Sequence, residues 1–586
     1  MFRSLARLLV FVQPYRGTVA LGIGAFLVAR LFEALVPFFL ARGIDALAGS
    51  DPHVLLPVLG IVLAVFARFF VVAFARFTVR KVAQNVAFDL RQRLYQQLQL
   101  QGARFFNRFS IGDMMTRAIS DIGLIQRLIA MGTILFVVLA FATVVGFSFM
   151  MMLAPRLTIA ILPPLPFVFA YTLHASRQMG VTSRDVQDRL SDLGTHVQEN
   201  LSGIRTIQAM AQEENEVARF AKTNQGYADA FYAQARINAA MTAWMPTLTA
   251  ASSLIILGYG GWLVETKMIT VGVFTAFFMY LNMVVQPFRV AGFIVNLFQR
   301  AAVASNRLFE IFDLAPEIVD RPSGATPQVI RGQLDVEHLS FRYDGAAANA
   351  LSDIDLHIAP GEIVAIMGRV GAGKTTLLKT MVRLLDPPHG SVKIDGHDVY
   401  DYPVSQLRSQ LAMVPQDPFL FGEPIRDNLT YDDPARAIDL IWQAAESADF
   451  KTTIEDLPAR LETIVGERGV TLSGGQKQRA TLARGLVRNA PVLILDDCFS
   501  AVDTGTEEHI LSELKKLRRG QTTVLVSHRV STARHADRIV VLEEGRIVEI
   551  GGHAELLARG GYYAELERIQ REGAQETDYA ALGANG

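Results

Sequence analysis

A phosphate-binding loop is the strongest chemical signal in the sequence. Residues 368–375 fit the pattern G-x-x-x-x-G-K-[ST]. Its glycines allow backbone N–H groups to turn towards phosphate oxygens, Lys374 would reach the β- and γ-phosphates, and the Thr375 hydroxyl would bind Mg²⁺. We therefore expect a nucleoside triphosphate with Mg²⁺ to bind here. The residues expected to contribute are Gly368, Arg369, Val370, Gly371, Ala372, Gly373, Lys374, Thr375 and Thr376.

The elements around this loop are those that the pattern requires. Ile363–Met367 is apolar and β-branched, which predicts a buried strand, and Thr376–Val382 predicts a helix. A glycine-rich turn without a ligand is the alternative. The strand before the loop and the helix after it favour phosphate binding, because the helix N-terminus adds positive potential.

Four other short segments carry polar groups next to predicted strands or helices. Val492–Asp496 is a second buried strand that ends in a carboxylate, which suits an aspartate that organises Mg²⁺. Gln416 follows Val414–Pro415, and His528 follows the strand Thr523–Ser527. A helix begins with the small and polar residues Ser473, Gly474, Gly475 and Gln476. Each signal is weak alone, since a turn or a structural histidine would look the same.

Composition indicates a membrane protein. The chain has 586 residues, of which 51% are hydrophobic, and its net charge of −1 gives no positive field for nucleic acid. Its single cysteine, Cys498, excludes a disulfide framework within the chain. The class expected is an integral membrane protein.

Hydropathy predicts six spans, each of roughly 20 residues. The loops after the second and fourth spans are long and rich in arginine, so they and both termini are expected in the cytoplasm. Reversals in these long loops are expected at Phe109–Asp113 and Ala211–Asn215. The six spans are expected near Val19–Leu40, Leu55–Phe77, Ile129–Leu153, Leu157–Leu173, Ala240–Val264 and Val271–Val295.

The fold class expected is an α-helical six-span transmembrane domain followed by an α/β P-loop ATPase domain. Prolines and glycines mark a linker between the two, and strands alternate with helices after it. The domains expected are a transmembrane domain at 1–313, a linker at 314–330, a nucleotide-binding domain at 331–570 and a disordered tail at 571–586.

Taken in this order, the motifs resemble those of ABC ATPases, and with the spans the chain resembles an ABC half-transporter of the bacterial multidrug- and lipid-exporter type. The resemblance covers residues 1 to about 570. It implies a dimer whose two cassettes close head to tail around two ATP molecules. It also implies that Tyr343 stacks on adenine, although Tyr343 could simply be a packed strand aromatic.

The same resemblance implies roles for the other motifs. Thr375, Gln416 and Asp496 would bind Mg²⁺ through ATP, and His528 would contact the γ-phosphate. Ser473, Gly475 and Gln476 would bind the ATP of the partner chain, with Gly474 in the same loop. The segments Phe109–Asp113 and Ala211–Asn215 would be the coupling helices that dock on the cassettes.

One residue departs from the family pattern. The usual strand ends Asp–Glu, but here the pair is Asp496–Asp497, and aspartate is one methylene shorter than glutamate. A displacement of about 1 Å can cost on the order of a hundredfold in rate, so we expect a slow site at Asp497 unless water or a backbone shift compensates. An intact Ser473–Gln476 loop could complete a faster site on a partner. A heterodimer is therefore favoured, and a homodimer stays open.

Charged residues lie within the first two predicted spans. Arg30 and Glu33 lie three residues apart in the first span, and Arg68 lies in the second. Such groups face a cavity or pair with each other. The function that the family resemblance implies is ATP-driven export of amphipathic small molecules, drugs or lipids, by alternating access. The alternatives are siderophore import by an exporter-shaped protein, and a mainly regulatory nucleotide-binding subunit.

Overall fold

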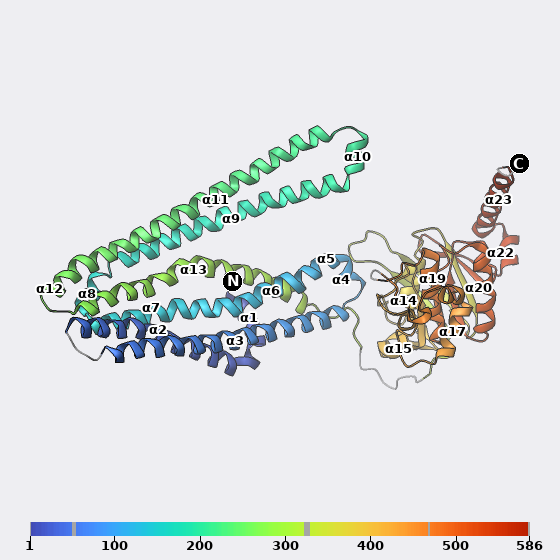
Figure 1. The fold of residues 1–586 in the computed structure, drawn as a ribbon. Coiled ribbons are helices and arrows are strands. Elements are labelled where there is room, and N and C mark those ends of the chain that lie inside the picture. Colours follow the sequence, from blue (N-terminus) through green and yellow to red (C-terminus); the bar gives the residue numbers. More distant parts are fainter. Residues whose placement is uncertain (1, 50–53, 321–328, 467–468, 584–586) are drawn as a thin grey trace. The chain divides into compact units, whose positions relative to one another are not determined.

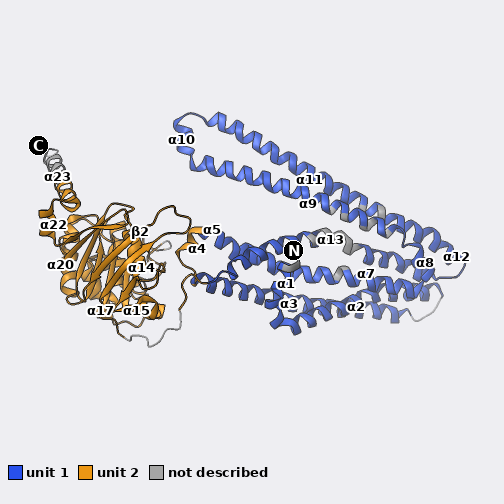
Figure 2. Ribbon diagram, turned by 180° about the vertical axis from the view of Figure 1, so that it is seen from behind, with its two compact units in different colours: residues 1–99, 109–315 blue, residues 100–108, 316–586 orange. Residues whose placement is uncertain are grey.

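The computed structural model describes residues 2–49, 54–320, 329–466 and 469–583 (Figure 1). The chain divides into two compact units, which Figure 2 colours separately. The first comprises residues 1–99 and 109–315, and the second comprises residues 100–108 and 316–586. About half of the linker expected at 314–330, residues 321–328, lies outside the described residues.

The first unit is entirely helical in its described part. Three five-residue π-helical stretches, at Arg117–Asp121, Leu128–Gly132 and Ile256–Gly260, join helices end to end. The helices are α1 (Phe2–Val12), α2 (Arg16–Ala48), α3 (Leu55–Gln99), α5 (Ile111–Thr116), α6 (Ile122–Arg127), α7 (Thr133–Leu153), α8 (Pro155–Ala160), α9 (Pro164–Ser202), α10 (Ile204–Ala209), α11 (Glu213–Ile255), α12 (Gly261–Glu265) and α13 (Val271–Phe312).

Within the described residues, four continuous helical runs are long and apolar enough to cross a membrane. They are Ser4–Ala48, Leu55–Gln99, Ile111–Leu153 and Glu213–Glu265, and α13 begins with a shorter apolar stretch, Val271–Val285. The expected span Leu157–Leu173 is interrupted, because α8 ends at Ala160 and α9 begins at Pro164. Consecutive prolines at 163 and 164 lack the N–H groups that would continue α8.

Both reversals in the long loops lie a few residues before the expected positions. Ser110 caps α5, its hydroxyl accepting a hydrogen bond from the Asp113 amide at 3.2 Å, so 110–113 starts a helix. The short helix before it is α4 (Ala103–Arg108). The second reversal contains α10, and Glu213 already begins α11, with acidic residues in its first turn where the helix dipole favours them. Figure 1 shows α9 and α11 side by side, joined by α10.

The charged side chains predicted in the spans pair with each other. Arg30 forms an ion pair with Glu33, and the second carboxylate oxygen of Glu33 lies 3.3 Å from Arg68 on α3. Nearby, the buried hydroxyl of Tyr280 donates to the carbonyl of Ala34 at 2.8 Å, which ties α13 to α2. The pairing of Arg30 with Glu33 is the structural alternative raised from the sequence, and Arg68 extends it to three residues.

The second unit contains two β-sheets. One has four antiparallel strands in the order β2-β1-β4-β5, and the other has six strands in the order β10-β9-β3-β8-β7-β6. The strands are β1 (Leu334–Phe341), β2 (Leu351–Ile358), β3 (Ile363–Gly368), β4 (Val392–Ile394), β5 (His397–Asp398), β6 (Leu411–Val414), β7 (Val492–Asp496), β8 (Thr522–Val526), β9 (Arg538–Glu543) and β10 (Arg546–Gly551).

The larger sheet is parallel from β9 to β6, and only β10 runs antiparallel. Alternate residues of β3 enter two different cores, with Ala365 in one and Ile366 in the other, so both faces of the sheet are covered. The helices are α14 (Lys374–Met381), α15 (Val404–Gln410), α16 (Ile425–Leu429), α17 (Ile438–Ser447), α18 (Lys451–Glu455), α19 (Gly474–Val487), α20 (Thr504–Leu517), α21 (Val530–Ala533), α22 (His553–Arg559) and α23 (Tyr562–Gly583).

Two features of this unit differ from the expected boundaries. Residues 100–108 belong to it: the Glu317 carboxylate accepts hydrogen bonds from the amides of Phe105, at 2.6 Å, and Arg104, at 3.3 Å. At the other end, α23 continues to Gly583, where we expected a disordered tail from 571. Alanine, glutamine, glutamate and leucine favour helix in that stretch. Residues 584–586 lie outside the described part.

Candidate nucleotide site

The predicted site residues converge at one edge of the larger sheet. The loop at 369–373 follows β3, Gln416 follows β6, Asp496 ends β7 and His528 follows β8. Because these strands are parallel neighbours, their carboxyl ends meet, and such edges bind ligands in α/β proteins. A cavity of about 270 Å³ there is lined by Tyr343, Ala350, Val370, Gly371, Ala372, Gly373, Lys374, Thr375, Thr376, Gln416, Asp496, Asp497, Val526 and His528.

The glycines of the loop after β3 are required by its backbone. Gly368, Gly371 and Gly373 have φ of 146°, 88° and 97°. A Cβ atom on Gly368 would lie 2.1 Å from the carbonyl oxygen of Leu542, and one on Gly373 would lie 2.5 Å from that of Ala350. Helix α14 starts directly after the loop, so its N-terminal amides point towards the cavity.

Lys374 is buried at the start of α14. Its Nζ donates to the carbonyl oxygens of Gly368, at 2.7 Å, and Arg369, at 2.8 Å. Burial lowers the pKa of Lys374, and the carboxylates of Asp497 and Asp496 oppose that shift. A phosphate oxygen entering the loop would offer the ammonium group a stronger, charged acceptor than these carbonyls.

The residues predicted to bind Mg²⁺ lie beside this lysine. The Thr375 hydroxyl donates to Asp496 Oδ1 at 3.1 Å, and Asp496 is 2% exposed. The pKa of Asp496 is raised overall, because the effect of burial exceeds the opposite effect of the hydrogen bond from Thr375. Because Gln416 lines the same cavity, the groups available as metal ligands are a carboxylate, a hydroxyl and an amide oxygen. These are the hard oxygen ligands that Mg²⁺ prefers, so the residues fit this ion.

Asp497 occupies an unusual backbone conformation between two polar side chains. Its φ is 47°, and its amide donates to the carbonyl of Val526 at 3.1 Å. One carboxylate oxygen accepts from Gln416 Nε2 at 3.4 Å and lies 3.8 Å from His528 Nε2. Burial raises the pKa of Asp497, and His528 and Lys374 oppose the shift. The structure therefore brings the two predicted catalytic residues to the same cavity.

Tyr343 also lines the cavity. Its hydroxyl lies 3.1 Å from the Thr376 hydroxyl on α14, and its ring packs edge-on against Phe341 at 5.2 Å between centroids. These contacts give it the packing role that we raised as the alternative, while leaving it on the cavity wall where a base could stack.

The segment 473–476 does not join this cavity. Ser473 caps α19: its Oγ accepts from the Gln476 amide at 3.3 Å, and Gln476 Oε1 accepts from the Ser473 amide at 2.9 Å. This is a capping box, which by itself explains both residue types. The four residues lie at the exposed N-terminus of a 14-residue helix, so any ligand they bind would come from outside this cavity.

Sequence reasoning missed residues that hold the His528 segment. Arg529 forms an ion pair with buried Glu507 and donates to the carbonyl of Val502 at 3.0 Å. Gln570, from α23, makes hydrogen bonds to the same segment. These residues are separated by tens of positions along the chain and fit no motif, so no local pattern could have identified them.

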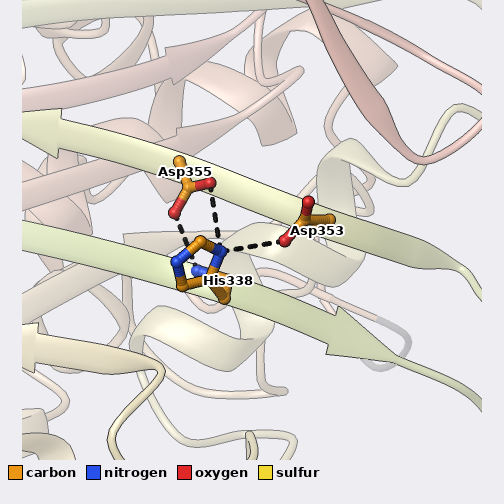
Figure 3. A group of neighbouring side chains, drawn as sticks. All are labelled: His338, Asp353 and Asp355. Carbon is orange, nitrogen blue, oxygen red and sulfur yellow. Dashed lines mark hydrogen bonds and ion pairs between the residues drawn. The ribbon is translucent and has the colours of Figure 1, made fainter.

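Another polar cluster lies outside the cavity, on β1 and β2 (Figure 3). His338 Nδ1 is 3.0 Å from Asp353 Oδ1 and 3.5 Å from Asp355 Oδ2, and all three side chains are exposed. The hydrogen bond to Asp353 raises the pKa of His338. The three groups could bind a metal ion, but each carboxylate already has the imidazole as its partner, and we assign them to surface ion pairs.

Comparison with known proteins agrees with this geometry. The family description "ABC transporter transmembrane region" matches residues 19–288, and "ABC transporter" matches residues 351–500. An uncharacterized ABC transporter ATP-binding protein of Bacillus subtilis is 33% identical over 576 residues, covering 97% of this chain and 95% of that protein.

Two further relatives carry more specific descriptions. A putative multidrug export ATP-binding/permease protein of Staphylococcus aureus is 33% identical over 96% of this chain and 99% of its own length. A solved bacterial Atm1-family ABC exporter with ATP bound is 27% identical, with a TM-score of 0.76, over 95% of this chain and 99% of that one. The chain therefore belongs to the ABC transporters, as an exporter-type half-transporter with an integral membrane domain and a cytoplasmic ABC ATPase domain in one polypeptide.

Proposed function

We propose that this half-transporter exports amphipathic small molecules, drugs or lipids, in a dimer that closes around ATP and Mg²⁺. The observation that carries the proposal is the convergence of Lys374, Thr375, Asp496 and Gln416 at one edge of a parallel sheet. The multidrug export named for the Staphylococcus aureus relative supports the substrate class. Six spans per chain, with α8–α9 and α13 as the fourth and sixth, complete the membrane domain.

Each site residue has a defined part in this proposal. ATP supplies the phosphoanhydride bond, and Mg²⁺ supplies charge neutralisation on the β- and γ-phosphates. The loop at 368–376 binds the phosphates, Tyr343 stacks on the base, and Thr375, Asp496 and Gln416 hold the ion. Asp497 orients the attacking water, His528 contacts the γ-phosphate, and Ser473–Gln476 completes the partner's site from the N-terminus of α19.

The partner that fits best is a second, different half-transporter. Asp497 is short for the task of orienting water, while the capping box keeps the Ser473–Gln476 loop in an ordered form that a partner can use. The same short carboxylate supports the regulatory alternative for this chain's own site. The alternative of siderophore import keeps the same architecture and differs in the direction of transport and in the substrate.

The test is ATP-driven transport in inside-out vesicles with a fluorescent amphiphile. Lys374→Ala should abolish ATP-dependent accumulation, because it removes the cation at the phosphates. The matched control is Lys451→Ala, a surface lysine paired with Glu446 at 3.2 Å, which should transport normally. Normal transport by Lys374→Ala would refute the nucleotide-site assignment, and ATP-driven release from preloaded vesicles would show import.

A further inference from the structure

Helix α23 is firmly attached at its N-terminus. The carboxylate of Glu549, on β10, accepts from the backbone amides of Tyr562, at 2.6 Å, and Tyr563, at 3.2 Å. The Tyr563 side chain is fully buried, and its hydroxyl lies 2.7 Å from His553 Nδ1. Two N-terminal amides and a core side chain therefore fix the direction in which α23 leaves the domain.

Farther along α23, the Gln570 side chain contacts the segment that carries His528. Its Nε2 donates to the backbone carbonyl of His528 at 2.7 Å, and its Oε1 accepts from the amide of Val530 at 2.9 Å. One side-chain amide thus pairs with a donor and an acceptor two residues apart, as a neighbouring strand would. This arrangement fixes the backbone on both sides of Arg529.

The His528 ring depends on this backbone for its position. In the part of the chain that the structure describes, the charged group paired with its Nε2 is the Asp497 carboxylate, at 3.8 Å, too far for a hydrogen bond. Other contacts hold the rest of the segment: the Ser527 hydroxyl accepts from the Arg529 amide at 3.0 Å, and Arg529 pairs with Glu507.

The same helix also reaches the phosphate-binding loop. The Arg369 guanidinium lies over the Tyr562 ring, 5.6 Å from its centroid, and a hydrogen bond with Tyr562 raises the pKa of Arg369. Two residues of α23, at 562 and 570, therefore contact two loops that line the nucleotide cavity.

We propose that Gln570 is a positioning residue for ATP hydrolysis, through which α23 holds His528 at the γ-phosphate. The proposal rests on the proposed function, since it takes His528 as the group that contacts the γ-phosphate. A displacement of about 1 Å at such a group can cost on the order of a hundredfold in rate, so loss of the two hydrogen bonds affects turnover more than nucleotide binding.

The test compares steady-state ATPase kinetics of the full-length chain in lipid nanodiscs, purified without a partner half-transporter so that the turnover measured arises at this chain's own site. Gln570→Met keeps the length of the side chain and removes both hydrogen bonds. We expect a fall of about tenfold in kcat, with the KM for ATP within about twofold of the wild type. The side chain in Gln570→Asn is one methylene shorter and reaches only one of the two hydrogen-bond partners. Its kcat should therefore lie between those of the wild type and Gln570→Met. The matched control is Arg568→Ala, an exposed residue on the same helix, which should change neither constant.

A double-mutant cycle separates positioning from a general structural role. If Gln570 acts through His528, adding Gln570→Met to His528→Ala should lower kcat no further. Hydrogen exchange of a peptide covering 527–531 should accelerate in Gln570→Met and not in Arg568→Ala, at an unchanged thermal midpoint. Wild-type kcat or unchanged exchange in Gln570→Met would overturn the inference. Wild-type kcat in His528→Ala would overturn the assigned role of His528, and the inference with it.

Discussion

Asp497 is the residue that we propose to orient the attacking water, and the structure allows the effect of lengthening its side chain to be estimated. Its carboxylate accepts from Gln416 at 3.4 Å and lies 3.8 Å from His528, so it already reaches the cavity. Glutamate would extend it by about 1.5 Å, the length of one carbon–carbon bond. If water placement limits the rate, Asp497→Glu should raise hydrolysis by up to about a hundredfold, or ~2.7 kcal/mol of activation free energy.

The backbone at Asp497 opposes part of this gain. Its φ of 47° lies in the left-handed region, which aspartate and asparagine tolerate better than glutamate. The strain is about 1–2 kcal/mol, so Asp497→Glu should also lower the thermal midpoint. Asp497→Asn preserves shape and backbone preference, and it removes the charge and one hydrogen-bond acceptor. It therefore tests the catalytic contribution of the carboxylate without this complication.

The assay measures ATPase of the chain purified alone and together with a candidate partner half-transporter. In a heterodimer, Asp497→Asn should remove little turnover, because little arises at this site. Ser473→Ala should remove most of it, because that loop completes the partner's faster site. Loss of all ATPase on Asp497→Asn in the chain purified alone would refute this reasoning and show a homodimer in which aspartate is the working catalytic group.

Two further predictions concern pH and the membrane domain. Burial raises the pKa of Asp497. In the chain purified alone, ATPase that depends on the ionised carboxylate should therefore be lost as pH falls, at a pH above the ordinary aspartate pKa of about 3.9. This acid limb in kcat/KM should persist in His528→Ala and disappear in Asp497→Asn. Arg68→Ala should alter substrate-stimulated ATPase and leave basal ATPase unchanged, since Glu33 keeps Arg30 as its partner. If both activities and the protein yield fall together, the ion pair of Arg68 with Glu33 is structural.

The phosphate-binding loop and its flanking elements could be predicted from the sequence because their causes are local. The loop needs glycines where φ is positive, a β-branched strand before it and a helix after it, and all three lie within about twenty consecutive residues. The family resemblance implied that Gln416, Asp496 and His528 share one site. The structure shows why they meet: each lies at the carboxyl end of a buried strand, and those strands are parallel neighbours.

Tertiary contacts decided what local patterns left open. Ser110 and Asp113 are typical of a turn, but the structure uses them to cap α5, because the chain reverses earlier, at α4. The association of residues 100–108 with Glu317 joins positions more than 200 apart. Gln570 and His528 are 42 residues apart and meet because Tyr563 is buried and Glu549 caps α23. Local propensity determines elements and motifs, whereas such long-range contacts depend on how the completed core directs each helix.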